Sequence, residues 1–185
     1  MQSNSREERQ THPYFMTSER LGFSLWTEDE LPLAQALWGD PAVSRYITAL
    51  GVFTADEIKA RLQLEIQNGK EHAVQYWPMF LLESDAFVGV CGLRPHGREK
   101  EYEIGCHLMK AFWNKGLAAE AVGRVIAYAF DDLGAESLFA GHNPMNTRSA
   151  NLLKKLGFTP IGEEYYPPTG LMHPSYRLGR EGQLR

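Results

Sequence analysis

Two short segments of the chain combine glycine, small and polar residues in patterns suited to binding a charged ligand. The first, residues 112–121, reads Phe-Trp-Asn-Lys-Gly-Leu-Ala-Ala-Glu-Ala and leads into a long helical pattern. The first turn of a helix leaves N–H groups unpaired and carries partial positive charge, so it can receive a pyrophosphate. Gly116 permits close approach to the backbone, and Lys115 adds a positive charge. Taken alone, the same residues also suit a helix start that only packs against a sheet.

The second segment, residues 146–158, reads Asn-Thr-Arg-Ser-Ala-Asn-Leu-Leu-Lys-Lys-Leu-Gly-Phe and again joins a polar turn, a helix and a strand. Asn146 and Ser149 have the spacing of a helix-capping pair, and Gly157 suits the residue that ends the helix. Each segment is ambiguous alone, and their order along the chain is the more informative feature.

The helices and strands that position these two segments can be predicted from the spacing of apolar residues and from helix-capping residues. Thr27 with Glu30, and Thr54 with Glu57, predict capping boxes at two helix starts. We expect helices at 28–39, 55–68, 116–133 and 146–156, and strands at 21–25, 73–82, 87–93, 101–109, 137–141, from 158, and at 175–178. This order predicts an α/β (mixed α+β) fold, with a mixed, mostly antiparallel sheet of about seven strands flanked by about four helices.

The helix expected at 55–68 carries its apolar stripe on Ile58, Leu62, Glu65 and Ile66, which we interpret as ordinary core packing, and Gly69 is placed to end it. Residues 1–16 are polar and aperiodic and predict an N-terminal tail, in which Tyr14 and Phe15 are the residues able to dock. Residues 17–180 then form a single domain.

Composition excludes several classes of protein. With a formal net charge of −4 and a pI near 5.9, the chain gives no general electrostatic reason to bind nucleic acid, and it suits a cationic or amine acceptor better. Cys91 and Cys106 form neither a disulfide framework nor a zinc motif, so no metal is expected. The polar N-terminus and the lack of a stretch of ~20 apolar residues predict a cytoplasmic protein without a membrane partner.

Together, the two segments resemble the GNAT superfamily of N-acetyltransferases, and most closely its RimJ/RimL-like branch. The likeness spans residues 17–178 and includes Glu19-Arg20-Leu21, the Tyr102-Glu103-Ile104-Gly105 strand, the block at 112–121 and the Asn-x-x-Ser helix ending in Leu-Gly-Phe. It implies the GNAT fold and an acyltransferase that uses acetyl-CoA as acetyl donor, with no metal. The implied reaction is direct attack of a primary amine on the acetyl group in a ternary complex.

The resemblance also implies which residues bind the cofactor. The superfamily signature Gln/Arg-x-x-Gly-x-Gly/Ala falls on residues 113–118, where Trp113 departs from the first position. The backbone cradle for the pyrophosphate remains available, and the implied members are Asn114, Lys115, Gly116, Leu117, Ala118 and Ala119. By the same resemblance, the backbone near Leu108 and Met109 pairs with the pantetheine arm, and Asn146 helps to hold the cofactor.

Glu103 is the candidate catalytic base, because an attacking amine must first lose a proton. Strand alternation puts Glu103, Gly105, His107 and Met109 on one face, and Glu103 matches a glutamate of the resembling branch. The alternative is an exposed or salt-bridged strand residue. His107 is a second candidate base or relay on the same face, and His142 and His173 are weaker ones.

The proton donor for the departing thiolate is less well marked. Many members of the superfamily carry a tyrosine four residues before the glycine of Leu-Gly-Phe, and here that position is Leu153. Ser149, directly or through water, is the motif-matched substitute, and the remaining candidates are Tyr165, Tyr166 and Tyr176.

The acceptor stays open at this stage. The RimJ/RimL-like branch implies a protein N-terminal amine, whereas other members of the superfamily acetylate small amines such as polyamines or aminoglycosides. A non-catalytic CoA-binding regulatory module is a further alternative, motivated by Trp113 and Leu153. The aromatic and proline-rich loop expected at 165–174 suits a substrate slot, a homodimer contact or a cover for the sheet edge.

Overall fold

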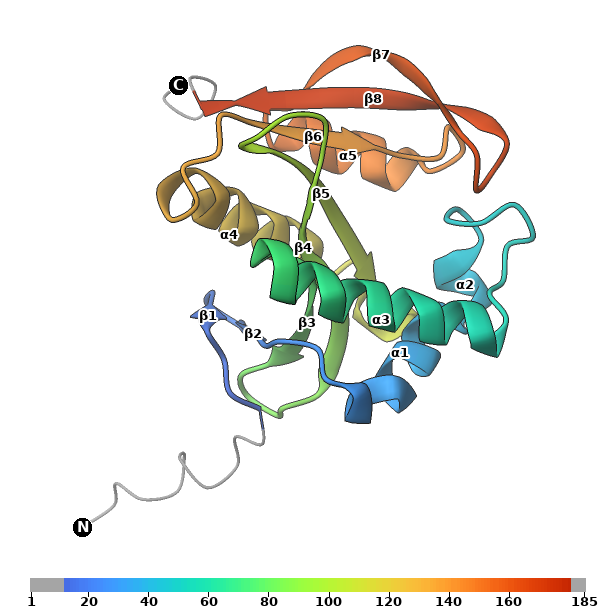
Figure 1. Cartoon of the computed structure of the whole chain (residues 1–185), viewed down its shortest axis with the longest axis vertical. Coiled ribbons are helices and arrows are strands. Elements are labelled where there is room, and N and C mark those ends of the chain that lie inside the picture. Colours follow the sequence, from blue (N-terminus) through green and yellow to red (C-terminus); the bar gives the residue numbers. More distant parts are fainter. Residues whose placement is uncertain (1–11, 181–185) are drawn as a thin grey trace.

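A computed structural model describes residues 12–180 and shows an eight-stranded sheet with helices on both faces (Figure 1). The strand order is β1-β2-β3-β4-β5-β6-β8-β7, and every neighbouring pair is antiparallel except the parallel pair β5–β6. This confirms the predicted mixed, mostly antiparallel sheet. The strands are β1 (Met16–Thr17), β2 (Leu21–Phe23), β3 (Tyr76–Leu81), β4 (Phe87–Pro95), β5 (Glu101–Leu108), β6 (Ser137–Gly141), β7 (Thr159–Tyr166) and β8 (Leu171–Gly179).

Within residues 12–180 there are five α-helices: α1 (Leu31–Trp38), α2 (Pro41–Ser44), α3 (Ala55–His72), α4 (Leu117–Asp131) and α5 (Thr147–Lys155). The unpredicted helix is α2, which Asp40 caps by accepting a hydrogen bond from the Ala42 amide at 2.8 Å. Short 3-10 turns, η2 (Glu28–Glu30) and η3 (Lys110–Phe112), precede α1 and α4. No helix in the described part of the chain has the length and apolar character needed to cross a membrane.

Two cores form, one on each side of the sheet, because strand side chains alternate between its faces. On one side α4 packs Ala121, Val125 and Ala129 against residues of the central strands. On the other side Trp38 of α1 packs with Leu62 of α3 and with Tyr76 and Val90 of the sheet.

The parallel contact between β5 and β6 is short. Only residues 101–103 of β5 pair with β6, through Glu101–Ser137, Tyr102–Leu138 and Glu103–Phe139. The rest of β5 stays paired with β4 as far as Gly89–Leu108, whereas β6 pairs with β8 through to Gly141–Ser175. The second half of β5 therefore has one edge that is not covered by β6.

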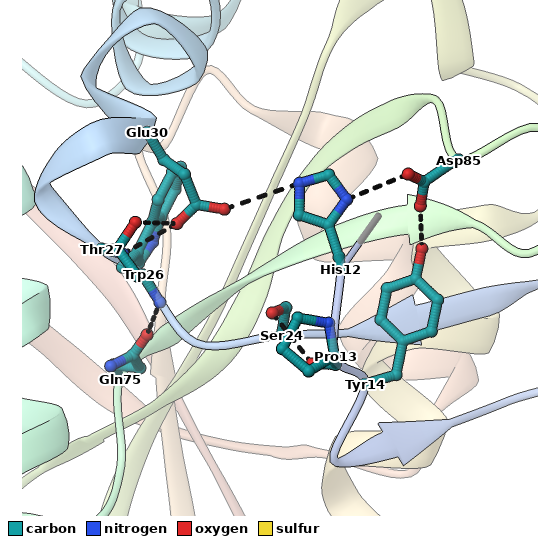
Figure 2. A network of polar contacts seen from close by, with 9 residues as sticks. All are labelled: His12, Pro13, Tyr14, Ser24, Trp26, Thr27, Glu30, Gln75 and Asp85. Atoms are coloured by element: carbon teal, nitrogen blue, oxygen red, sulfur yellow. Dashed lines mark hydrogen bonds and ion pairs between the residues drawn. The ribbon is translucent and has the colours of Figure 1, made fainter. Parts of the chain in front are cut away.

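The predicted tail of residues 1–16 lies in part outside the described residues, which begin at 12, and the described part contacts the domain. Figure 2 shows His12 between Glu30 and Asp85, with its Nε2 3.8 Å from Glu30 Oε1 and its Nδ1 3.1 Å from Asp85 Oδ2. The Tyr14 hydroxyl donates a hydrogen bond to the same Asp85 carboxylate (Figure 2), and the His12 ring stacks on Phe80. These contacts fix the chain just before β1.

The prediction that Gly69 ends the second long helix is wrong. The helix α3 continues to His72 and ends at Ala73, whose φ is 57°. A side chain at Gly69 would overlap the side-chain Nε2 of Gln75, so this glycine, within the helix, makes room for the Gln75 side chain that packs against it.

The expected loop at 165–174 is instead most of a β-hairpin. Tyr165 pairs with Met172 and Glu164 with His173, so only the turn between β7 and β8 is irregular. The strand β7 lies at the sheet edge and is exposed along nearly its whole length, so it lacks the apolar alternation by which strands are recognised. In the turn, Pro168 O accepts a hydrogen bond from Ala49 N at 2.5 Å, which ties the hairpin to the segment after α2.

Candidate active site

A cavity of about 690 Å³ opens along the uncovered edge of β5 and extends from the start of α4 to α2, α3 and the β7–β8 hairpin. Its lining carries five basic side chains and two acidic ones, although the chain as a whole has a formal charge of −4: Arg45, Arg61, Arg94, Arg148 and Lys155, with Glu103 and Glu164. The cavity is therefore more basic than the chain as a whole. The expectation of a cationic acceptor rested on the negative net charge of the chain, which the cavity lining does not share.

At one end of the cavity, the chain turns into α4 through two left-handed residues. Asn114 has φ 60° and Gly116, the residue before the helix, has φ 78°. Glycine adopts this conformation most easily, and asparagine tolerates it better than most residues. The space beside Gly116 is open except for the Arg20 guanidinium. The predicted residues Asn114, Gly116, Leu117, Ala118 and Ala119 all line the cavity.

Lys115, which was expected to add a charge there, does not line the cavity. Its ammonium lies over the Phe112 ring, 5.4 Å from the centroid, and its carbonyl accepts a hydrogen bond from Arg20 at 3.0 Å.

The loop before α4 is held by an ion pair that the sequence did not indicate. Arg20 Nε donates to Glu120 Oε2 at 2.7 Å, and the Ser18 hydroxyl donates to Glu120 Oε1 at 2.7 Å. Burial raises the pKa of Glu120, but the hydrogen bonds from Ser18 and Arg20 outweigh it, so the net pKa is lowered. The opening Glu19-Arg20-Leu21 thus supports the loop that precedes α4.

The free edge of β5 presents alternate peptide groups to the cavity. Met109 N donates to Val88 O at 2.9 Å, so Met109 and every second residue before it bond to β4. The peptide groups of Cys106 and Leu108 consequently face the uncovered side. Leu108 lines the cavity as expected, but Met109 does not.

Trp113 also uses this edge. Its indole Nε1 donates to Leu108 O at 2.8 Å, and the Arg148 guanidinium lies over its ring, 4.7 Å from the ring centroid. The residue that departs from the family signature therefore binds the strand directly and links it to α5.

The start of α5 forms the wall facing β5. Asn146 Oδ1 accepts a hydrogen bond from the Ser149 amide at 3.2 Å, which confirms the predicted capping pair. This bond leaves the Ser149 hydroxyl outside the cap, and both residues line the cavity.

Of the other candidate proton donors and relays, some line the cavity and one does not. Tyr165, Tyr166, His142 and His173 line it, whereas the Tyr176 hydroxyl is not in the lining and lies 3.3 Å from His142 Nε2. His173 Nε2 lies 2.7 Å from the Thr169 hydroxyl. Burial, followed by the nearby His142, lowers the pKa of His173.

Glu103 lines the other end of the cavity, and its side chain lies on the same face of the sheet as that of His107, the face-sharing that strand alternation predicted. Its Oε1 accepts a hydrogen bond from the Tyr76 hydroxyl at 3.3 Å. The Tyr76 ring packs directly against Gly105, where a Cβ would overlap the ring, so only glycine leaves room for Tyr76 to reach Glu103. Burial, and then the Glu103 charge, raise the pKa of Tyr76 well above its usual value, so Tyr76 stays protonated and donates to Glu103.

Behind Tyr76 lies a fully buried carboxylate. Glu65 has no exposed surface; its Oε1 pairs with the Arg94 guanidinium and its Oε2 accepts from Tyr76 N at 2.8 Å. Arg94 also lies over the Tyr76 ring, 4.1 Å from the centroid. Both oxygens of Glu65 are therefore engaged.

His107 completes this end. Trp38 Nε1 donates to His107 Nδ1 at 3.2 Å, so the neutral ring carries its proton on Nε2. Burial, and then the charges of Arg61 and Arg94, lower the pKa of His107 well below its usual range. His107 is consequently a neutral and weakly basic residue near Glu103, which counts against its role as the base.

Residues 20–159, more than half of the chain, match the family described as "Acetyltransferase (GNAT) domain". The chain belongs to the GNAT acetyltransferase family. Among curated relatives, the uncharacterized N-acetyltransferase p20 of Bacillus licheniformis is 28% identical over 146 residues, covering 78% of this chain and 82% of the relative. The uncharacterized N-acetyltransferase YnaD of Bacillus subtilis (strain 168) is 30% identical over 118 residues, covering 64% of this chain and 66% of the relative.

Solved structures agree on the GNAT fold. A GNAT acetyltransferase from Bacillus anthracis matches with a TM-score of 0.76 and 24% identity, covering 90% of this chain and 98% of that one. The ribosomal L7/L12 α-N-protein acetyltransferase RimL, solved in complex with coenzyme A, matches with a TM-score of 0.76 and 16% identity, covering 92% and 99%.

The residues of this GNAT acetyltransferase that the sequence missed are those around Tyr76, namely Arg61, Glu65 and Arg94. One signal was present: Glu65 sits within the apolar stripe of α3, where a carboxylate must have a buried partner. In residues 12–180, no group of three or more His, Cys, Asp or Glu is arranged to hold a metal.

Proposed function

We propose that this acetyltransferase moves the acetyl group of acetyl-CoA to a primary amine that binds beside Glu103, with both substrates in the cavity together. The observation that carries the proposal is that one continuous cavity joins a helix start suited to a pyrophosphate with a carboxylate suited to accept a proton. Acetyl-CoA supplies a thioester carbonyl carbon that a neutral amine can attack.

The donor end fits this ligand. Gly116 brings the free amides of the first turn of α4 to the cavity, where they suit the pyrophosphate. The peptide group of Cys106 and the N–H of Leu108 suit the amides of the pantetheine arm, which would then add to β5 as a strand does, whereas Leu108 O already accepts from Trp113. Asn146, at the start of α5, stands on the opposite wall.

Glu103 is proposed to accept the proton of the bound ammonium, so that the amine nitrogen becomes a nucleophile. The carboxylate lines the cavity next to the end of the β5–β6 pairing, and Tyr76 fixes one of its oxygens by a hydrogen bond. The amine nitrogen then forms a bond to the carbonyl carbon as the carbon–sulfur bond breaks.

The departing sulfur takes a proton from Ser149 or from a water that this hydroxyl orders. The second proton, which the nitrogen loses as it becomes an amide, returns to the same hydroxyl or water, so that the products are a neutral amide and a free thiol. The side-chain oxygen of Ser149 is not used in the helix cap and lies on the cavity wall. With Leu153 buried at the family's tyrosine position, Ser149 is the motif-matched hydroxyl that lines the cavity.

We propose an α-amine as the acceptor. An α-amine has a reference pKa of roughly 7.7 to 8.0 against about 10.4 for lysine, so a carboxylate deprotonates it more readily. One fold relative is named as an α-N-protein acetyltransferase, which supports the same class of acceptor.

The test is an acceptor screen, read out as release of free thiol from acetyl-CoA, with peptides bearing free N-termini, polyamines and aminoglycosides. We expect turnover with at least one α-amine, and Glu103→Gln should lower kcat by roughly 10²- to 10⁴-fold because it removes the base and keeps the size. Affinity for acetyl-CoA should stay unchanged.

Glu99→Gln is the matched control, since Glu99 is an exposed glutamate in the turn before β5. Unchanged kcat and an unchanged pH profile in Glu103→Gln would show that Glu103 is structural. Acetyl-CoA binding without acetylation of any amine would contradict the proposed reaction itself.

A further inference from the structure

The acceptor end of the cavity contains a cation whose partner is missing from the described protein. Arg61 of α3 lines the cavity and lies between two rings, 5.0 Å from the Trp38 centroid and 5.3 Å from that of Phe53. Its Nε is shielded from solvent and has no hydrogen-bond partner within residues 12–180. No ion pair links this guanidinium to an acidic side chain in that range either.

The two acidic side chains around Tyr76 are already engaged. Glu65 gives one oxygen to Arg94 and the other to the Tyr76 amide, and it has no exposed surface. Glu103 accepts from the Tyr76 hydroxyl at 3.3 Å. The charge of Arg94 is therefore balanced by its ion pair with Glu65, whereas the charge of Arg61 on the cavity wall has no such partner in residues 12–180.

A partly buried, unpaired guanidinium is costly, because desolvation is not repaid by a counter-ion. Burial, and then the charge of Arg94, lower the pKa of Arg61, and the Glu65 charge offsets them only in part, so the charged form is disfavoured in the free protein. An anion that entered the cavity would stabilise the charged form and would occupy the rigid, forked donors of the guanidinium.

We infer that Arg61 binds a carboxylate of the acceptor, carried a few bonds from the amine that is acetylated. The inference rests on the proposed function, because the amine must reach Glu103 while the carboxylate reaches Arg61. Both residues line one cavity, and a chain of side-chain contacts joins them. Tyr76 bonds Glu103 and forms an edge contact with His107, and His107 accepts from the indole of Trp38, over whose ring Arg61 lies. An ammonium and a carboxylate of one molecule would meet opposite charges at these two places.

The same charges disfavour polycations. A polyamine or an aminoglycoside would bring further ammonium groups toward Arg61 and Arg94, where like charges repel in a poorly solvated site. A free amino acid and a peptide that begins with an acidic residue share the favoured chemistry, and the experiment separates these two sources.

The experiment uses acceptor pairs that differ in one carboxylate, and each kcat/KM is calculated for the neutral amine, because a nearby carboxylate raises the pKa of the amine. One arm compares free L-alanine with L-alaninamide, and the other compares the peptides Asp-Ala-Ala-amide and Asn-Ala-Ala-amide. In the wild-type protein we expect kcat/KM for the anionic member to exceed that for its neutral partner by about 10- to 100-fold in at least one arm, as expected for a charged hydrogen bond. Arg61→Gln should reduce this ratio to about one, and Arg61→Lys should retain part of it.

Lys59→Gln is the matched control, because it removes one positive charge from an exposed position on the same helix. It should leave the ratio unchanged. A merely structural Arg61 would lower turnover of both members of a pair equally, so the ratio separates recognition from instability.

A wild-type ratio near one in both arms would overturn the inference and leave the proposed acetyl transfer standing. A preference that survives in folded Arg61→Gln would also overturn the role of Arg61. If no amine is acetylated, the proposed function fails. Whether Arg61 binds a carboxylate is then tested by the affinity of N-acetylated ligands. N-acetyl-L-alanine should bind more tightly than N-acetyl-L-alaninamide, or N-acetyl-Asp-Ala-Ala-amide more tightly than N-acetyl-Asn-Ala-Ala-amide, by at least about tenfold in the presence of CoA. Equal calorimetric affinities within both pairs would refute the site.

Discussion

The donor end and the acceptor end of the cavity are built from different parts of the chain. The donor end consists mainly of backbone: the left-handed turn at Asn114 and Gly116, the first amides of α4, and the free edge of β5. The acceptor end consists of side chains from separate elements, with Trp38 on α1, Glu65 on α3, Tyr76 on β3 and Arg94 on β4.

This difference has physical consequences. A backbone site depends on chain geometry, so it tolerates a departure such as Trp113 at a signature position, provided that Gly116 keeps its conformation. A site made of interlocking side chains depends on each partner, because the loss of one leaves a buried charge or donor unpaired. Substitutions at the acceptor end should therefore disturb stability, whereas those at the donor end should disturb ligand affinity.

The largest effect is expected for Glu65→Gln. This change leaves the Arg94 cation without its buried counter-ion, and we expect the free energy of unfolding to fall by about 3 to 5 kcal/mol. Chemical denaturation would measure it. Glu71→Gln, at an exposed position of the same helix, should change stability by less than about 0.5 kcal/mol. Similar stabilities for the two variants would mean that the acceptor end is not interlocked as described.

A smaller effect, of a different kind, is expected at the donor end. Gly116→Trp should weaken acetyl-CoA binding by roughly 10- to 100-fold, because the new side chain obstructs the approach of phosphates to charge-assisted hydrogen bonds. Gly134→Trp is a close control: Gly134 follows the other end of α4 with φ 63° and open space, so it carries similar backbone strain away from the cavity. Equal calorimetric affinities in the two folded variants would contradict the assignment.

The same contrast explains what could be predicted from the sequence. Period and capping residues act locally, so the boundaries of β6 were predicted at Ser137–Gly141 and the α4 start fell within one residue of Gly116. The donor segment is contiguous in the chain, and its glycine and small residues are readable there. Boundaries failed where a distant contact decided them, as at Gly69, whose missing side chain makes room for Gln75.

The acceptor network could not be predicted because its members are far apart in sequence. Arg94 and Glu65 are 29 residues apart, and Tyr76 and Glu103 are 27 apart. Helical period placed Glu65 on the apolar stripe of α3, but period alone does not identify the partner of a buried carboxylate. The cationic lining likewise could not be deduced from a net charge, which averages over the whole surface.

The smallest effect is expected for Ser149→Ala, which tests whether the donor end also holds a catalytic hydroxyl. The helix cap of α5 uses the Ser149 amide and the Asn146 side chain, so removal of the hydroxyl leaves that hydrogen bond in place. We therefore expect an unchanged melting temperature and unchanged acetyl-CoA affinity, with kcat lowered by roughly 2- to 10-fold, the scale of one neutral hydrogen bond.

Asn146→Ala provides the comparison for Ser149→Ala, because it removes the cap and keeps the hydroxyl. It should cost about 0.5 to 2 kcal/mol of stability, since the Ser149 amide loses its side-chain partner. If Ser149→Ala instead lowers the melting temperature as Asn146→Ala does, its hydroxyl is structural. If the variant is stable and fully active, the sulfur takes its proton elsewhere. The tyrosines that line the cavity, Tyr165 and Tyr166, are then the groups to replace with phenylalanine, because the Tyr176 hydroxyl lies outside the lining against His142.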